Sequence, residues 1–163
     1  MAEVTVAVRR AAPYDTRAMA GLLNRIIATG GTTAMTRPVA PAEILGWLGR
    51  THAAWHVAEL QGDIVGFQWI EPWDALPPEA ANIATFVQQG RTGLGIGSAL
   101  FRATEHAARN MGYAWINANI RADNESGLTY YQSRGFRVWN HVKNVEIAPG
   151  LIVDKIWKRY DLD

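Results

Sequence analysis

The sequence predicts a single α/β (α+β) domain built from about seven strands and four helices. Its 163 residues suffice for one substantial core and are too few for two ordinary domains, so residues 1–163 are expected to form one unit. Short apolar, β-rich runs alternate with segments whose apolar residues recur at helical spacing. Their order along the chain is β-α-α-β-β-β-α-β-α-β-β.

The first part of the chain predicts one strand followed by two helices. Val4 to Arg9 alternates in the manner of a strand. Pro13 to Thr29 has apolar residues at helical spacing, and Gly30-Gly31 ends that helix. After an aperiodic loop, Pro41 stands at the first turn of a short helix that runs to about Arg50.

Three strands are expected next. Trp55 to Leu60 and Ile64 to Ile70 are apolar runs joined by Gln61-Gly62-Asp63, which is typical of a hairpin turn. Residues 71–79 contain three prolines and are expected to form an exposed connection, because proline cannot donate to a strand ladder. Asn82 to Val87 follows as the next strand.

The last part predicts a helix, a strand, a second helix and two closing strands. Asp123 is expected to cap the second of these helices, because a carboxylate accepts hydrogen bonds from the first turn. Pro149-Gly150 is expected to form the turn between the closing strands. The segments are Gly95 to Asn110, Tyr113 to Ile120, Asp123 to Ser133, Gly135 to Ile147 and Leu151 to Tyr160.

Composition excludes several classes of function. The net charge is +1, from 16 basic and 15 acidic residues, which gives no indication of a nucleic-acid partner. The chain has no cysteine, which excludes disulfides and a thiolate nucleophile, and its four histidines lack metal-ligand spacing, so no metal is expected. Without a signal peptide or a run of about 20 apolar residues, we expect a soluble, cytoplasmic protein with no membrane association.

A glycine-rich turn between a strand and a helix indicates an anion site. Gly93, Gly95 and Gly97 let the backbone approach a phosphate, and the N-terminus of the following helix adds partial positive charge. The alternative is that these glycines only permit a tight turn. A nucleotide P-loop is excluded because no lysine follows Gly97, and a dinucleotide fingerprint is excluded because only Ile96 separates the last two glycines.

A second stretch, Asn124 to Phe136, contains Tyr-Tyr-x-x-x-Gly-Phe after an asparagine. Asn124 and Tyr131 are seven residues apart, about two helical turns, so both point off one face. Together the two stretches resemble the GNAT superfamily of N-acetyltransferases, whose pyrophosphate motif reads Gln/Arg-x-x-Gly-x-Gly/Ala. Thr92 stands where that motif has Gln or Arg, and Arg91 could compensate.

The resemblance implies the GNAT fold, with a central mixed, mostly antiparallel sheet, and acetyl-CoA as co-substrate. It implies that Asn124 binds the pantetheine or phosphate region and that Tyr131, with an ordinary pKa of ~10, protonates the leaving thiolate. Residues 31–34 and 71–79 further resemble the phosphinothricin-acetyltransferase-like branch. The remaining cofactor-binding residues implied are Phe86 and Val87, through backbone N–H groups of a bulged strand, and Thr92, Gly93, Leu94, Gly95, Ile96 and Gly97.

The general base is left open by the residues. The phosphinothricin-like branch carries a glutamate on the fourth strand, and Asn82 stands in that place. Glu79, with Glu71 as the other choice, is the nearest carboxylate along the chain. A water chain, or an amine that arrives already neutral, would serve equally well.

The function expected is acetylation of the primary amine of a small molecule, such as an amino acid or an amino-acid analogue. The alternatives are a CoA-binding sensor or interaction module without turnover, and an acetyltransferase of protein N-termini or lysines. A homodimer is expected because the C-terminal hairpin carries more apolar surface than one sheet face needs, although these residues could instead pack under the first two helices. They are Trp139, Val142, Val145, Ile147, Ile152 and Trp157.

Overall fold

The computed structural model describes residues 5–91 and 94–163, and in these residues the predicted order of strands and helices is confirmed. The strands are β1 (Ala7–Arg10), β2 (Ala54–Leu60), β3 (Asp63–Glu71), β4 (Ala80–Val87), β5 (Trp115–Arg121), β6 (Arg137–Ala148) and β7 (Leu151–Asp161). The helices are α1 (Thr16–Thr29), preceded by the 3-10 turn η1 (Pro13–Asp15), α2 (Pro41–Leu48), α3 (Ile96–Asn110) and α4 (Glu125–Ser133).

The strands form one sheet in the order β1-β2-β3-β4-β5-β7-β6. Neighbouring strands are antiparallel except for β4 and β5, so the expected mixed, mostly antiparallel sheet is confirmed. β4 and β5 pair only from Ala80 opposite Trp115 to Ile83 opposite Ala118. Beyond that point β4 stays with β3 while β5 stays with β7, so the sheet opens between β4 and β5.

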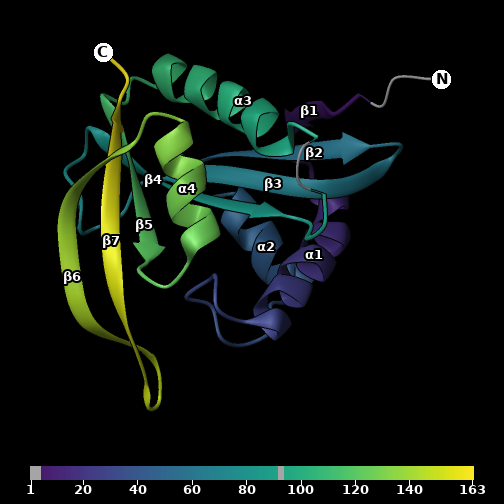
Figure 1. Cartoon of the computed structure of the whole chain (residues 1–163). Helices are drawn as coiled ribbons and strands as arrows, with labels where there is room; N and C mark the ends of the chain where they lie inside the picture. The colour runs from purple at the N-terminus through teal and green to yellow at the C-terminus, as the bar shows by residue number, and fades with distance from the viewer. Residues whose placement is uncertain (1–4, 92–93) are drawn as a thin grey trace.

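Helices cover both faces of the sheet (Figure 1). On one face α1 and α2 bury Met19, Leu23 and Ile44 against the aromatic rings of Trp55 and Phe67. On the other face Leu100 of α3 packs on β2 and β3, and α4 joins α3 in a core with β4 and β5. The opening between β4 and β5 therefore has α1 and α2 on one face of the sheet and α3 and α4 on the other.

Helix α4 begins differently from the prediction. Asn124, rather than Asp123, is the N-cap, and its Oδ1 accepts a hydrogen bond from the Gly127 N–H at 3.0 Å. The Asp123 carboxylate instead receives two hydrogen bonds from the Arg121 guanidinium, at 2.9 and 2.8 Å. A bidentate arginine is a stronger partner for a carboxylate than a backbone N–H, so the cap falls to the next residue.

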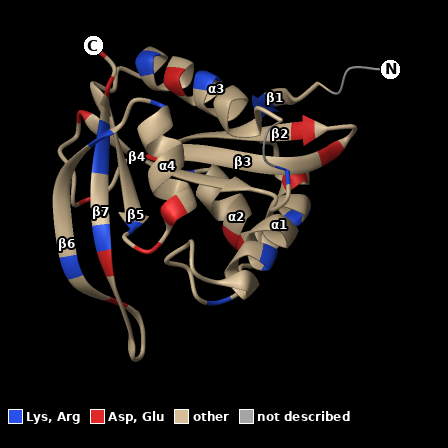
Figure 2. Ribbon diagram, viewed as in Figure 1, with Lys and Arg blue, Asp and Glu red and all other residues tan. Residues whose placement is uncertain are grey.

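Charges of both signs are interspersed along α3 and β7 (Figure 2). In the described part of the chain, no helix combines the length and apolarity needed to cross a bilayer. Val4, which was expected to start the first strand, lies outside the described residues, and β1 begins at Ala7.

Candidate active site

A cavity of about 900 Å³ lies where β4 and β5 diverge. It extends from the start of α3 past α4 to the segment after α1. Its wall includes Thr85 and Val87 of β4, Ile120 of β5 and Tyr131 of α4. Ile26, Trp69, Glu71, Asn82, Ile83, Ala84, Phe86, Asn119, Arg121, Asn124, Tyr130, Arg134, Lys155 and residues 32–35, 88–91 and 95–98 also line it.

Strand register decides which β4 amides face the opening. The Gln88 N–H donates to the Val65 carbonyl at 2.8 Å, and in an antiparallel pair alternate residues point to the same neighbour. The Phe86 N–H therefore faces β3, and the predicted role of its amide is wrong. The N–H groups of Thr85 and Val87 face the side from which β5 has departed. Sequence alone could not fix this parity, because it depends on which β4 residues sit opposite β3.

The start of α3 has the geometry expected of an anion site. Gly95 is the N-cap in the left-handed conformation, with φ of 73°, and nothing lies within 4 Å of the position that a Cβ would take. The Ala99 N–H donates to the Gly95 carbonyl, so the amides before Ala99 lack helical acceptors. Gly95, Ile96 and Gly97 line the cavity, whereas Leu94 is exposed and does not. Thr92 and Gly93 lie outside the described residues.

Gly97 has a second reason to be glycine. A Cβ at this position would come within 2.6 Å of the ring of Tyr130. The Tyr130 hydroxyl donates to the Gly97 carbonyl at 2.7 Å, so this tyrosine is packed directly on the first turn of α3. The third glycine of the turn thus serves helix packing, in addition to any contact with an anion.

A buried polar network connects the two tyrosines to the sheet. Gln68 Nε2 donates to the Tyr130 hydroxyl at 3.0 Å and to Thr85 Oγ1 at 2.9 Å. Thr85 Oγ1 is 2.8 Å from the Tyr131 hydroxyl. Because Thr85 already accepts from Gln68, its own proton can go to the Tyr131 oxygen, which leaves the Tyr131 proton free for a group in the cavity.

Both tyrosines are held in the protonated form. Burial raises the pKa of Tyr130 to about 12, and burial also raises the pKa of Tyr131 above its ordinary value. Sequence reasoning identified Tyr131 and missed Gln68, Thr85 and Tyr130. A polar Gln68 inside the apolar run of β3 was the available signal, because a buried amide needs partners.

The two glutamates considered as bases lie in different places. Glu71 lines the cavity at the end of β3, opposite Asn82, and its carboxylate forms an ion pair with Arg50 at 3.0 Å. Glu79 is exposed, is not part of the cavity wall, and only its backbone carbonyl is engaged, by the Ala114 N–H. The structure therefore gives no support to Glu79 as the base, because its side chain is exposed to solvent and does not line the cavity.

Asn82 contributes an amide to the cavity rather than a carboxylate. Its Oδ1 accepts from Asn117 Nδ2 at 3.0 Å, and Asn117 Oδ1 in turn accepts from the Trp139 indole at 2.8 Å. The side-chain carbonyl of Asn82 is therefore committed within the fold. Its amide nitrogen remains for a group in the cavity, and an amide nitrogen cannot accept a proton.

Asn124 lines the cavity, but its side chain also has a structural role, because it hydrogen-bonds to the backbone of two segments. Besides capping α4, it donates from Nδ2 to the Thr32 carbonyl at 3.1 Å. Arg134, which the sequence did not single out, lies near the start of α3, where its Nη1 donates to Ser98 Oγ at 2.6 Å. With Arg91, it adds positive charge to the end of the cavity beside the start of α3, the candidate anion end.

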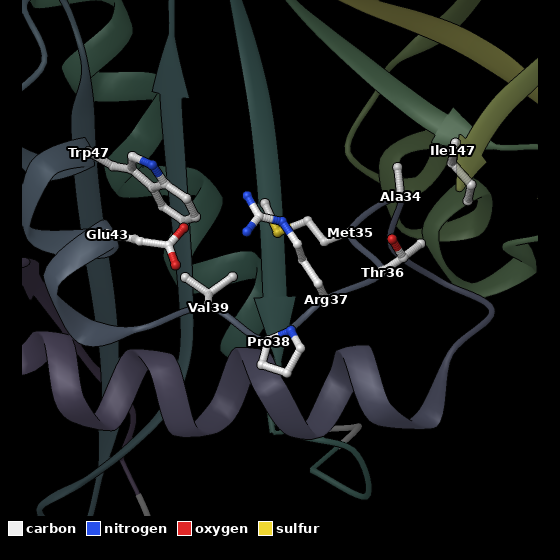
Figure 3. A pocket seen from close by; sticks show the side chains of 9 residues that line it. All are labelled: Ala34, Met35, Thr36, Arg37, Pro38, Val39, Glu43, Trp47 and Ile147. Atoms are coloured by element: carbon white, nitrogen blue, oxygen red, sulfur yellow. The ribbon is translucent and has the colours of Figure 1, made fainter. Parts of the chain in front are cut away.

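A smaller cavity of about 270 Å³ adjoins the larger one at Ala34 and Met35, which line both. Its wall comes from the segment after α1, from Glu43 and Trp47 of α2, and from Ile147 of β6. In Figure 3 the Arg37 guanidinium rises between Met35 and the side chains of Glu43 and Trp47. Ile147 of the C-terminal hairpin therefore lines the same cavity as the segment between the first two helices.

The chain is similar in sequence to known acetyltransferases. The model of the acetyltransferase (GNAT) family matches residues 26–136. YwnH of Bacillus subtilis, provisionally named a phosphinothricin acetyltransferase, is 29% identical over 160 residues, covering 95% of this chain and 94% of its own. The phosphinothricin N-acetyltransferase of Streptomyces viridochromogenes is 25% identical over 135 residues, 80% of this chain and 74% of its own.

Solved structures share the fold. A GNAT superfamily phosphinothricin acetyltransferase from Sinorhizobium meliloti, determined in complex with acetyl-CoA, superposes with a TM-score of 0.85 at 19% identity. The match covers 96% of this chain and 88% of the other.

Proposed function

Because the chain belongs to the GNAT family of acetyltransferases and is an acetyl-CoA-dependent N-acetyltransferase, we propose that it acetylates the primary amine of a small molecule, such as an amino acid or an amino-acid analogue. The observation that carries the proposal is that one continuous cavity, the larger of the two described, is lined by the start of α3, by Tyr131 and by the polar side chains beside Asn82. The two relatives named for phosphinothricin, an amino-acid analogue, support a small acceptor.

The residues at the anion end fit the diphosphate of acetyl-CoA. The amides of the first turn of α3 would hold it, because they lack helical acceptors and lie at the positive end of the helix dipole. Arg134 and Arg91 would add charge. The N–H groups of Thr85 and Val87 would bind the rest of the molecule in place of the missing β5 partner.

Acetyl-CoA, when bound, supplies an acetyl group joined to sulfur as a thioester. Transfer forms a bond between the acceptor nitrogen and the acetyl carbon and breaks the bond between carbon and sulfur. The sulfur leaves as a thiolate, which takes a proton, and the nitrogen loses one. Tyr131 is placed to give the first proton, because Thr85 can occupy its oxygen as a donor and leave its O–H directed elsewhere.

In the part of the chain that the structure describes, no side chain is placed to take the proton of the acceptor nitrogen directly. Asn82 presents an amide, and Glu71 lies opposite it in the register. Thr85 is three residues further along β4, about 10 Å at the rise of a strand. Since Glu71 is also paired with Arg50, we propose that the acceptor reacts as the neutral amine or loses its proton to ordered water.

The test is release of free thiol from acetyl-CoA across a panel of acceptors. The panel contains α-amino acids, L-phosphinothricin, simple alkylamines, and peptides with a free N-terminus or lysine. The proposal expects turnover with at least one small amine and faster turnover than with any peptide. Turnover confined to peptides would make the chain a protein acetyltransferase. Binding of acetyl-CoA in calorimetry without turnover on any acceptor would make it a sensor or interaction module.

A further inference from the structure

Lys155 of β7 is a buried cation that has no counter-ion among the described residues. Its exposed fraction is 7%, yet it lines the large cavity. Among residues 5–91 and 94–163 its Nζ makes no ion pair and no hydrogen bond, and the ammonium keeps some accessible surface on a side chain that lines the cavity. A buried ammonium without a partner is costly, which indicates that a ligand supplies the missing anion.

The neighbouring charges do not fill this role. Arg121 is opposite Lys155 in the pairing of β5 with β7, and it is another cation. Its guanidinium is already committed to the Asp123 carboxylate and to the Thr33 carbonyl, the latter at 3.1 Å. Burial, reinforced by the charge of Arg121, lowers the pKa of Lys155. A bound anion would reverse both effects, because it would replace lost hydration and offset the neighbouring positive charge.

Lys155 belongs to the acceptor side of the cavity. Side chains alternate along strands, and the register places Lys155 on the same face as Arg121 and Asn119 of β5. Asn117 and Asn82, whose side chains are hydrogen-bonded, share that face. The diphosphate end at α3 lies on the other face, with Arg134 and Tyr130. Asn119 Oδ1 is also buried without a partner among the described residues.

We propose that Lys155 binds the carboxylate of the acceptor and so selects α-amino acids and their analogues over simple amines. The proposal rests on the proposed function, since it assigns the residue that recognises the acceptor. Lysine suits this task because its long stem lets a compact charge reach into a cavity from a strand. The Arg121–Asp123 pair supports the site by fixing the neighbouring strand and the carbonyl of Thr33.

The experiment compares each accepted amino acid with its own carboxamide, which keeps the amine and the side chain and loses only the carboxylate charge. In the wild type, kcat/KM for the acid should exceed that for the carboxamide. In Lys155→Met the ratio of the two values should fall about a hundredfold, mostly through KM for the acid, whereas Lys155→Arg should recover part of it. The dissociation constant of acetyl-CoA should stay within about threefold.

Lys158→Met is the matched control. Lys158 is on the same strand and is 5% exposed, but it points to the opposite face, where its Nζ donates to the Leu128 carbonyl at 3.1 Å. This variant should leave the ratio of acid to carboxamide within about threefold of the wild type. An equal loss of kcat with acid and carboxamide in Lys155→Met would make Lys155 a proton acceptor, and weaker binding of acetyl-CoA would make it a cofactor contact. Either result overturns the proposal.

A binding measurement separates this proposal from the proposed function. Calorimetry of the CoA-loaded protein with L-phosphinothricin should show binding that Lys155→Met weakens about a hundredfold and Lys158→Met does not. If no amine is acetylated but this difference appears, the proposed function fails and the anion site stands. If amines are acetylated and Lys155→Met has no effect on acids, the proposed function stands and the anion site fails. If neither substrate turnover nor binding is seen, both fail.

Discussion

The polar side chains in and next to the cavity differ in their hydrogen bonding between the two faces of the sheet. On the face covered by α3 and α4, Gln68, Thr85 and Tyr131 are linked by hydrogen bonds of 2.8–2.9 Å. On the face toward α1 and α2, Lys155 and Asn119 Oδ1 find no partner among the described residues. Apart from Gln68 Oε1, which has no partner among the described residues, this network is formed before any ligand binds, and it fixes the groups used with every substrate. Groups left without partners are those that a variable ligand can satisfy.

The largest effect should come from closing the anion end. Gly95→Val places a β-branched residue at φ of 73°, which strains the turn, so binding of acetyl-CoA should be lost in calorimetry. Gly112→Val is the matched control, because Gly112 has φ of 85°, equal room for a Cβ and no place in the cavity wall. The two variants should lose similar stability, and only the first should lose binding. Unchanged affinity in Gly95→Val would remove α3 from the site.

Removal of the Tyr131 hydroxyl should lower kcat about 100-fold or more, the usual scale for losing a general acid, with little change in acetyl-CoA affinity. Because burial raises the pKa of Tyr131, the phenol stays protonated through neutral pH, and any loss of its acid function should begin only above pH ~10. Tyr130→Phe should cost less, since that hydroxyl is occupied by the Gly97 carbonyl. Wild-type turnover in Tyr131→Phe would make this tyrosine structural.

Thr85→Val keeps the shape of the side chain and removes the donor to Tyr131. We expect kcat to fall about tenfold and the free energy of unfolding to fall by about 1–2 kcal/mol, because Gln68 Nε2 loses an acceptor. Thr104→Val is the control, since Thr104 is fully buried on α3 and its hydroxyl has no partner among the described residues. A normal kcat in Thr85→Val would show that Tyr131 does not depend on this contact.

The pH dependence of kcat/KM sharpens the account of the acceptor's proton. If the neutral amine reacts, kcat/KM for an amine of pKa ~9 should rise about tenfold per pH unit up to that pKa. Glu71→Gln should keep this slope and lose less than about threefold in rate, and the exposed Glu79→Gln should match the wild type. If Glu71→Gln abolishes the rise of kcat/KM with pH and most of the activity, Glu71 is the base and the neutral-amine account is wrong.

The smallest effect on activity is expected from the oligomeric state. We predict a homodimer through the β6–β7 hairpin, because β6 is an edge strand and Val138, Trp139 and Ile152 are 49%, 41% and 57% exposed. Light scattering at micromolar concentration should give twice the mass of the chain. In Ile152→Lys the measured mass should fall to that of one chain. Tyr14→Lys, in η1 and 76% exposed, should leave the mass unchanged. A wild-type monomer would contradict the prediction.

Local patterns were sufficient for the fold and for one end of the site. Apolar periodicity predicted the element order, and two motifs located the start of α3 and Tyr131, because each depends on residues close in sequence. The parity of the β4 amides depends on register with β3, so Phe86 was misassigned. Closeness along the chain favours Glu79, but it does not decide whether a side chain reaches the cavity, and Glu79 is exposed outside it.

Lys155 could not be found from the sequence, because its position depends on the order of strands in the sheet. β7 pairs with β5 although a helix and β6 separate them along the chain, and this pairing puts Lys155 beside Arg121. Arg134 was missed for a similar reason, since its contact with Ser98 joins two helices that are far apart in sequence. Pairing across the sheet therefore places Lys155, and packing between helices places Arg134.

The most direct test of a division between the two faces is steady-state kinetics of Arg134→Gln and Lys155→Met with both substrates varied. The account predicts that Arg134→Gln raises KM for acetyl-CoA about tenfold and leaves KM for the amino acid within about twofold, because only a phosphate contact is lost. Lys155→Met should raise KM for the amino acid about a hundredfold and leave KM for acetyl-CoA within about threefold. If either variant raises both constants equally, or if the two effects are exchanged, the faces do not divide cofactor from acceptor and the account is contradicted.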